Sequence, residues 1–355
     1  MLTKRGGFQS APFFSFSPPQ NKVILIYENN SNLKEEAFME DNGDMCIGID
    51  IGYGFTKVHS DNKSDSFPTA VSAMFRKTEF SCVKPISVNG KDFIVGKDAE
   101  THGGVLETRT QSFVCSDPWI AVLTYALHTH NFQSGVIVLG LPPGMYSQRY
   151  GHAIKESMKN ASVFIDGMEL QYRVNGNVKI IPQGAGIYFS HTKDNPDDIL
   201  KNVAVVDCGH ETLDFALFAE NKYIESVTSS VRLGASVAID EIKSEFYKNY
   251  HFQINSSAAR NALIHGRDEI VHLGKSYPVN IKKCIEAYAL QVSAAIDRFI
   301  ENAPNTPDVA IVAGGPAELI REYIKVHNVS IANNAIMANA IGYWYYGIQT
   351  SISES

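Results

Sequence analysis

Two short segments of the sequence repeat one pattern, and this repeat restricts the possible folds more than any other feature. In each segment an apolar run ends in an aspartate, a glycine follows two positions later, and a charged residue stands seven positions after the aspartate; the segments are 47–57 and 204–214. A further strand-like run follows each turn, so each segment predicts a β-hairpin with a tight, exposed turn. The repeat therefore predicts two units that are built alike.

The residues of these turns favour a site for an anion and a metal ion. Gly52, Gly54 and Gly209 let backbone N–H groups approach an anion, because no Cβ stands in the way. Asp50 and Asp207, at the strand ends, are held rigidly and can face Mg²⁺ directly or through its water ligands. Either turn alone could be an ordinary Asp-Gly turn. Two such turns that face each other would hold a polyphosphate between two domains.

A third junction, near the C-terminus, agrees with this chemistry. The apolar run 309–312 leads into Gly314 and Gly315, and Pro316 then predicts the start of a helix. Backbone N–H groups at such a strand–glycine–helix junction can come close to a nucleoside or a phosphate. By itself, the junction is weak evidence for a nucleotide site. Its position after the second hairpin makes this interpretation stronger.

Strand and helix patterns alternate from residue 45 onward. Hairpins at Asn89-Gly90 and Asp166-Gly167 are followed by crossover helices, which predicts a mixed α/β sheet in each half of the chain. The aromatic run 343–346 is typical of a packing cluster. Expected strands are 46–50, 56–60, 67–71, 86–88, 93–95, 136–141, 178–181, 203–207, 213–218, 223–231 and 308–312. Helices are expected over 147–158, 235–250, 280–302 and 316–324, and two more are expected to begin at 116 and at 256. Segment 334–348 closes the chain.

Residues 1–44 differ from the rest of the sequence. Phenylalanine, serine and proline are frequent at the start of this segment, and its apolar run 23–27 is far too short to cross a membrane. Prolines also interrupt any signal-peptide core. We expect a poorly structured extension, which either precedes a natural start at Met39 or Met45 or docks a partner.

The overall charge argues against direct contact with nucleic acid. Lysine and arginine number 31 against 38 aspartates and glutamates, which gives a formal net charge of −7, without the basic balance that such binding requires. The five cysteines are scattered and form no C-x-x-C pair, which favours reduced thiols over a disulfide framework or a zinc site. No apolar run is long enough to span a membrane. We therefore expect a cytoplasmic protein with no membrane partner.

Together the motifs resemble those of the superfamily that contains actin, the heat-shock chaperones and the hexokinase-like ATPases. Their order, from residue 45 to about residue 348, is more specific than any single motif. Within the superfamily, the sequence of segment 49–57 is typical of the bacterial ParM and StbA plasmid-segregation proteins. The matching residues are Asp50, Gly52, Tyr53, Gly54 and Lys57 in the first phosphate loop, residues 181–186 in the first connecting motif, Asp207, Gly209, His210, Glu211, Thr212 and Asp214 in the second phosphate loop, Gly234 at a helix start near the nucleoside, and Gly314, Gly315 and Pro316 in the adenosine motif.

This resemblance implies an actin-like (ribonuclease H-like) α/β fold, with two similar domains around a nucleotide cleft. The first domain would span 45–182 and be completed by 333–355, and the second would span 183–332. The resemblance also implies binding of ATP with Mg²⁺, hydrolysis of the ATP, and polymerisation into nucleotide-dependent filaments. A role in plasmid or DNA segregation would require a DNA-binding adaptor protein, because the chain itself is acidic.

The resemblance further assigns roles to individual side chains. Gln183 would orient the attacking water. Asp50 and Asp207 would hold hydrated Mg²⁺, and Lys57 would place a positive charge on the phosphates. The glycines of the helix start and of the adenosine motif would line the nucleoside.

Three positions depart from the family pattern. Tyr53 stands where actin-like proteins often have a small hydroxyl residue, and His210 and Glu211 stand where small, glycine-rich residues are usual. A glutamate beside phosphates repels them unless its side chain points away or contacts the metal. We therefore expect slow hydrolysis rather than loss of nucleotide binding.

Two other functions remain open. A small-molecule kinase of the same fold needs a base for the acceptor hydroxyl, and Asp117 and Asp166 are candidates by residue type only. A non-polymerising, chaperone-like ATP-binding protein would share the same motifs. A Walker A loop is excluded, because Glu269 stands where a motif ending in Gly274-Lys275 requires its first glycine.

Overall fold

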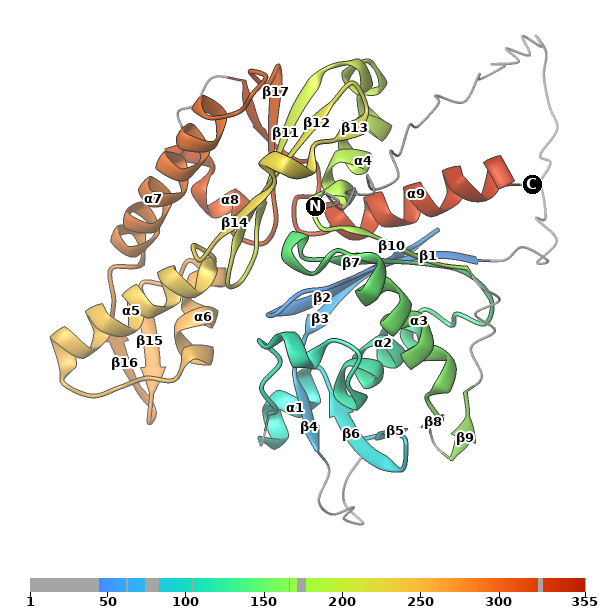
Figure 1. The fold of residues 1–355 in the computed structure, drawn as a ribbon. Helices are drawn as coiled ribbons and strands as arrows, with labels where there is room; N and C mark the ends of the chain where they lie inside the picture. The colour runs from blue at the N-terminus through green and yellow to red at the C-terminus, as the bar shows by residue number, and fades with distance from the viewer. Residues whose placement is uncertain are drawn as a thin grey trace, which may run out of the picture.

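The computed structural model describes residues 45–61, 63–73, 83–103, 105–165, 167–170, 177–324 and 328–354. The predictions for segment 1–44 and for Asp166 lie outside these residues. Figure 1 shows two groups of strands and helices, and the helix near the C-terminus, α9 (Ala338–Glu354), runs between them.

The first group is built on a mixed sheet. Its strands lie in the order β10 (Val178–Pro182), β7 (Gly135–Leu141), β1 (Met45–Ile51), β2 (Phe55–Ser60) and β3 (Lys63–Pro68). β1 pairs antiparallel with β2 and parallel with β7. Every residue of β1 from Cys46 to Asp50 is buried, as expected for a central strand that is covered on both faces. The hairpin predicted for 47–57 is confirmed.

Helices cover both faces of this sheet. Ile47 and Ile49 of β1 belong to the same apolar cluster as the buried face of α2 (Asp117–Thr129). The alternate residues face α9, since a Cβ on Gly48 would lie 2.1 Å from the Ala340 carbonyl oxygen. α2 begins as predicted at Ser116, whose side chain accepts a hydrogen bond from a backbone N–H of the first turn. The helix α3 (Gln148–Asn160) follows β7.

A small antiparallel sheet extends the first group. Its order is β4 (Val71–Ala73), β6 (Lys91–Val95), β5 (Ile86–Val88), β8 (Val163–Ile165) and β9 (Met168–Glu169). Asn89 and Gly90 join β5 to β6 with φ angles of 52° and 78°, the left-handed pair that a tight hairpin turn requires. The hairpin predicted there is confirmed. The short helix α1 (Lys97–His102) follows β6.

The second group repeats the pairing of the first. Its order is β13 (Lys222–Tyr223), β12 (Leu213–Ala219), β11 (Asn202–Cys208), β17 (Val309–Ala313) and β18 (Val329–Ile331), and β14 (Ser229–Val231) also pairs with β12. β11 is antiparallel to β12 and parallel to β17, as β1 is to β2 and β7. The sequence repeat therefore marks the same hairpin in two sheets that are built alike.

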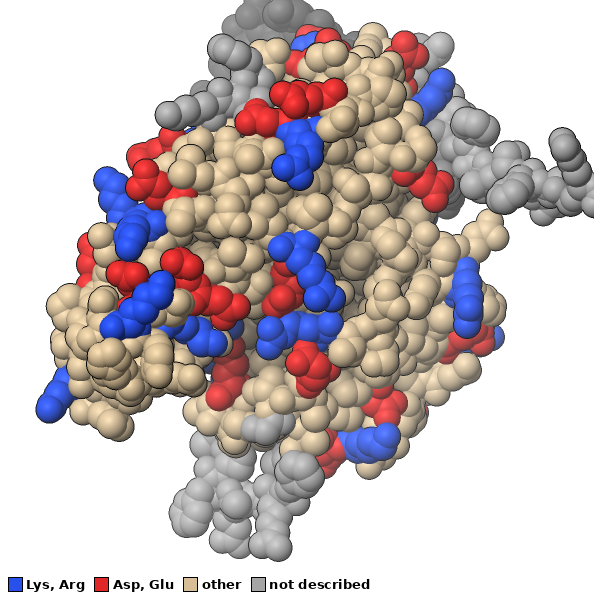
Figure 2. Space-filling model, turned by 60° about the vertical axis from the view of Figure 1, so that its left-hand side comes forward, with Lys and Arg blue, Asp and Glu red and all other residues tan. Residues whose placement is uncertain are grey.

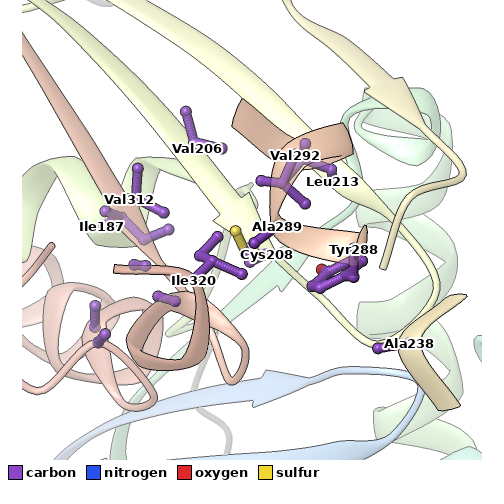
Figure 3. Packing of buried hydrophobic residues seen from close by; sticks show 14 of the residues in the cluster. Ile187, Val206, Cys208, Leu213, Ala238, Tyr288, Ala289, Val292, Val312 and Ile320 are labelled. Carbon is purple, nitrogen blue, oxygen red and sulfur yellow. The ribbon is translucent and has the colours of Figure 1, made fainter. Parts of the chain in front are cut away.

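Long helices complete the second group. They are α4 (Ala185–Asp194), α5 (Ala235–Tyr250), α6 (Ser256–His265), α7 (Ile281–Glu301) and the short α8 (Ala317–Ile320), with a hairpin of β15 (Glu269–His272) and β16 (Lys275–Pro278) between α6 and α7. Figure 3 shows Tyr288 and Ala289 of α7 beside Cys208 of the sheet, in the core of this group. Short 3₁₀ helices lie at Gln111–Phe113, Pro143–Met145, Pro196–Leu200, Glu225–Val227 and Arg321–Tyr323.

Some predicted elements differ from the observed ones. The strand predicted at 67–71 is two strands, because β3 ends at Pro68 in its pairing with β2, whereas β4 begins at Val71 and pairs with β6 of the small sheet. The strand predicted at 223–231 is broken by a 3₁₀ turn, in which the Val227 N–H bonds back to the Ile224 carbonyl. The helix predicted at 316–324 ends at Ile320 and continues as a 3₁₀ turn. The patterns used above predict neither α1, α4 nor the β15–β16 hairpin.

Charged side chains of both signs are interspersed on the face shown in Figure 2, without a broad area of positive charge. This agrees with the acidic composition. Within the described residues, no helix combines the length and the apolar character that crossing a membrane would take.

Candidate functional site

The turns of the two repeated hairpins have the geometry that the sequence predicts. In the first, the Gly52 N–H donates to the Phe55 carbonyl at 3.2 Å, and in the second the Gly209 N–H donates to the Thr212 carbonyl at 2.9 Å. Each turn thus closes directly behind its strand-end aspartate. Asp50 is paired across the first hairpin with Lys57.

Both turns open into one cavity of about 480 Å³. The structure brings most of the predicted site residues to its wall, from the two hairpins, from the end of β10 and from the junction after β17. These residues are Asp50, Gly52, Tyr53, Gly54, Lys57, Gln183, Asp207, Gly209, His210, Thr212, Gly315 and Pro316.

Two predicted glycines lie behind this wall instead. A Cβ on Gly314 would stand 2.2 Å from the Cys208 carbonyl oxygen, and a Cβ on Gly234 would stand 2.4 Å from the His210 carbonyl oxygen. Gly314 also has a φ of 95°, which L side chains rarely adopt. Both glycines allow the backbone to pack directly against the second turn, and they support the cavity without lining it.

Asp50 forms the centre of a polar cluster at the first hairpin. Lys57 Nζ lies 3.0 Å from Oδ2 of Asp50, and Gln183 Nε2 donates to Oδ1 at 3.0 Å. The Asp50 side chain is almost fully buried. Burial opposes the charge on Lys57, but Asp50 and Asp207 outweigh it and raise the pKa of Lys57. The ammonium group is therefore held charged inside the cavity.

Asp207 and Asp214 are direct cross-strand partners in the second hairpin. Burial raises the pKa of Asp207, and repulsion from Asp50 raises it further. Burial also raises the pKa of Asp214, although Thr212 Oγ1 donates to its carboxylate at 2.8 Å. The cavity therefore holds more acidic than basic groups. A bound cation would reduce the repulsion between the carboxylates of Asp50, Asp207 and Asp214.

Hydrated Mg²⁺ fits this arrangement better than a directly ligated ion. Among the described residues, no three histidine, cysteine, aspartate or glutamate side chains gather closely enough to hold a metal ion by themselves. Asp50 and Asp207 instead offer carboxylate oxygens on opposite hairpins, and Mg²⁺ commonly keeps several of its waters.

The two unusual residues of the second turn, His210 and Glu211, face the first group. A Cβ on Gly54 would stand 2.9 Å from Cγ of His210, so the imidazole packs directly on the first turn. Glu211 does not line the large cavity; it lines a neighbouring one of about 380 Å³ and pairs with Arg109 at 3.1 Å. The side chain of Glu211 therefore points away from the large cavity, where the phosphates are expected to bind.

The structure adds residues that the motifs do not include. Arg260 of α6 lines both cavities, lies 5.7 Å from the centre of the Phe55 ring and pairs with Glu100 at 2.6 Å. Leu263 and Ile264, from the same helix, line the apolar side of the large cavity. The sequence predicts a helix that begins at 256, but no local signal in the sequence shows that the face of this helix meets the first hairpin.

Asp117, considered as a kinase base, lies elsewhere. It accepts hydrogen bonds from Lys91 and Asn89, both at 2.8 Å, and does not line the cavity. Partial burial acts in the opposite direction, but these bonds lower the pKa of Asp117, which makes it a poor proton acceptor. Cysteines Cys46, Cys115, Cys208 and Cys284 are free thiols in the described part of the chain.

Comparisons with known families identify the class of protein. Residues 48–186 match the N-terminal domain of actin-like proteins, and residues 205–326 match the C-terminal domain of the archaeal, MreB-like actin homologues. The two matches contain both hairpins and the large cavity's polar cluster. The chain belongs to the actin-like superfamily.

Solved structures of ParM and of an archaeal actin homologue have a similar fold. A non-polymerisable quadruple mutant of the pCBH ParM is 20% identical, with a TM-score of 0.70 over 86% of this chain and 100% of that chain. An archaeal actin homologue is 21% identical, with a TM-score of 0.72 over 88% and 100%. A subunit of a 15-stranded ParM filament from Clostridium botulinum is 19% identical, with a TM-score of 0.72 over 86% and 99%. The predicted two-domain actin-like fold is confirmed. A search of the curated proteins found no match to the sequence.

Proposed function

We propose that the protein binds Mg-ATP in the large cavity, hydrolyses it, and assembles with copies of itself into nucleotide-dependent filaments. The observation that carries this proposal is the pair of facing hairpins, with the carboxylates of Asp50 and Asp207 and the ammonium group of Lys57 in one cavity. Proteins of this family are typically ATPases. An archaeal actin homologue in complex with ADP and a Bacillus thuringiensis ParM with AMPPNP have similar folds.

The chain's own residues would position the reactants rather than react covalently. The N–H groups of the two turns other than those of Gly52 and Gly209, which close the turns, would hold the phosphates, and Lys57 would add a fixed positive charge. Gln183 would orient the attacking water through its carboxamide, which already bonds to Asp50. Mg²⁺, held through its waters by Asp50 and Asp207, would supply charge neutralisation on the phosphate oxygens.

The nucleoside would occupy the side of the cavity between α6 and α8. Leu263, Ile264, Leu319 and Ile336 give this side an apolar surface suited to a base. Pro316, at the junction after β17, adjoins them. The Gly234 and Gly314 positions would act through the backbone that they support.

The domain boundaries predicted above fit this scheme. The first domain would comprise 45–182 with 333–355, since α9 packs on β1 and β7. The second would comprise 183–332, and its helix α4 packs against α9 at the junction. Closure of one domain on the other would respond to the γ-phosphate and so change the surface available for assembly.

We infer a role in plasmid or DNA segregation from the likeness to ParM filaments. The protein is acidic, so contact with DNA would run through a basic adaptor protein rather than through the chain itself. This role would require a cytoplasmic location. Asp117 is disfavoured as the base of a kinase, because it is outside the cavity and engaged by Lys91.

Electron microscopy and phosphate release test the proposal together. The purified protein with Mg-ATP should form filaments and release phosphate slowly, and Asp207→Ala should abolish both. Absence of filaments across a range of salt and protein concentrations, with nucleotide bound, would favour a non-polymerising, chaperone-like protein instead.

A further inference from the structure

Asn339 forms hydrogen bonds with both halves of the site. The residue is on α9 and is 5% exposed. Its Oδ1 accepts a hydrogen bond from the Gly184 N–H at 3.2 Å, and its Nδ2 donates to Oδ2 of Asp207 at 2.7 Å. Both polar ends of the carboxamide are thus engaged, one at the start of α4 and one at the end of β11.

Close contact between α4 and α9 fixes the place of this side chain. A Cβ on Gly186 would stand 2.5 Å from the Asn339 carbonyl oxygen, and a Cβ on Gly342 would stand 1.7 Å from the Gly186 carbonyl oxygen. The two helix backbones therefore touch. Asn339 cannot move relative to Gly184 unless the helices separate.

A path of three hydrogen bonds, with one covalent step along the backbone from Gln183 to Gly184, consequently joins the two aspartates of the site. Gln183 donates to Asp50 at 3.0 Å, and the next residue, Gly184, donates to Asn339, which in turn donates to Asp207. The residue expected to orient water and the two residues expected to face Mg²⁺ are linked through one carboxamide.

Asp207 needs such a partner because two other carboxylates lie near it, and the charge of Lys57 offsets them only in part. Asp214 is its direct cross-strand neighbour, and Asp50 lines the same cavity. A carboxylate with no donor would turn away from both. The carboxamide of Asn339 holds Oδ2, whereas Oδ1 faces Gly314, where a Cβ would stand only 2.9 Å away.

We propose that Asn339 is a positioning residue that sets the orientation of the Asp207 carboxylate for hydrated Mg²⁺ bound with nucleotide. This inference rests on the proposed function. A hydrogen bond to a carboxylate is stronger than one between neutral groups. Its loss should reduce the gain in nucleotide affinity that Mg²⁺ provides by about tenfold and should leave the affinity without Mg²⁺ nearly unchanged.

The experiment measures the affinity for a fluorescent, non-hydrolysable ATP analogue, once with excess Mg²⁺ and once with excess EDTA. The variants are Asn339→Ala and Asn339→Ser, both too short to reach Asp207. If the alanine variant fails to fold, the serine variant gives the result. Tyr343→Phe is the matched control: it lies one turn further along α9, is buried, and its hydroxyl has no hydrogen-bond partner in the described part of the chain.

The expected result is a Mg²⁺ gain that falls about tenfold in the Asn339 variants and stays at the wild-type value in Tyr343→Phe. An unchanged gain overturns the inference. A loss of affinity that is equal with and without Mg²⁺ also overturns it, because Asn339 would then be merely structural. A wild-type protein that binds no nucleotide under either condition overturns the proposed function itself.

Discussion

Glu211 Oε1 lies 3.1 Å from Nη1 of Arg109, and this ion pair joins the turn of the second hairpin to the loop between α1 and α2. The adjacent His210 packs on Gly54 of the first turn. Next to the Arg260–Glu100 ion pair, which also joins the two groups, the second turn therefore makes one ionic and one steric contact with the first group. The residues that depart from the family pattern in the second turn make these contacts.

Reversing the charge of either partner in the Glu211–Arg109 pair should speed nucleotide release. Glu211→Arg brings two arginines together, and Arg109→Glu brings two glutamates together. Because both side chains are partly exposed, each change should cost about 1 kcal/mol or less, which corresponds to a roughly twofold to fivefold faster dissociation. Stopped-flow release of a fluorescent nucleotide measures this rate.

The double swap Glu211→Arg/Arg109→Glu is the control for that prediction. It restores opposite charges and should return the rate close to the wild-type value at low salt. High salt should shrink all of these differences by screening. A double swap that releases nucleotide as fast as either single variant would show that the pair does not hold the groups together.

Gly54→Ala should weaken nucleotide binding severalfold, because the new Cβ would stand 2.9 Å from Cγ of His210 and force the two turns apart. Gly54→Ala combined with His210→Gly should regain most of the affinity, since this change removes both Cγ, at 2.9 Å, and Cβ, at 3.0 Å, from the new methyl group. Gly144→Ala is the control, because no atom lies within 4 Å of its added Cβ. Calorimetric titration with nucleotide measures each affinity, and failure of the double variant to recover would argue against steric contact as the cause.

Lys57→Met should destabilise the fold strongly. The substitution leaves the buried Asp50 carboxylate without its cation, which typically costs about 3–5 kcal/mol, and Gln183 then remains as its side-chain donor among the described residues. Asp50→Asn combined with Lys57→Met removes both charges and should recover most of the loss. Urea unfolding measures the free energies. A double variant no more stable than Lys57→Met would mean that the lysine stabilises through packing rather than through the pair.

Local sequence patterns predict the hairpins well but not the contacts between them. The turns after Asp50 and Asp207 follow from strand-end aspartates and nearby glycines, and both are confirmed. The Asn339 and Arg109 contacts join residues more than a hundred positions apart. The packing of whole helices determines which of these residues come into contact. Neither the residue types nor their spacing along the chain predicts these contacts.

The crossing of α4 and α9 offers a direct test of how closely those helices pack. Gly342→Ala would place a Cβ 1.7 Å from the Gly186 carbonyl oxygen, so the helices must separate, and overpacking of this kind costs about 1–3 kcal/mol. Gly151→Ala is the matched control within α3: its Cβ would meet only Ile180 Cδ1, at 3.7 Å, and alanine should stabilise that helix by up to about 1 kcal/mol. Urea unfolding of both variants should therefore give shifts of opposite sign. A Gly342→Ala protein as stable as the wild type would refute the close crossing on which the Asn339 path depends.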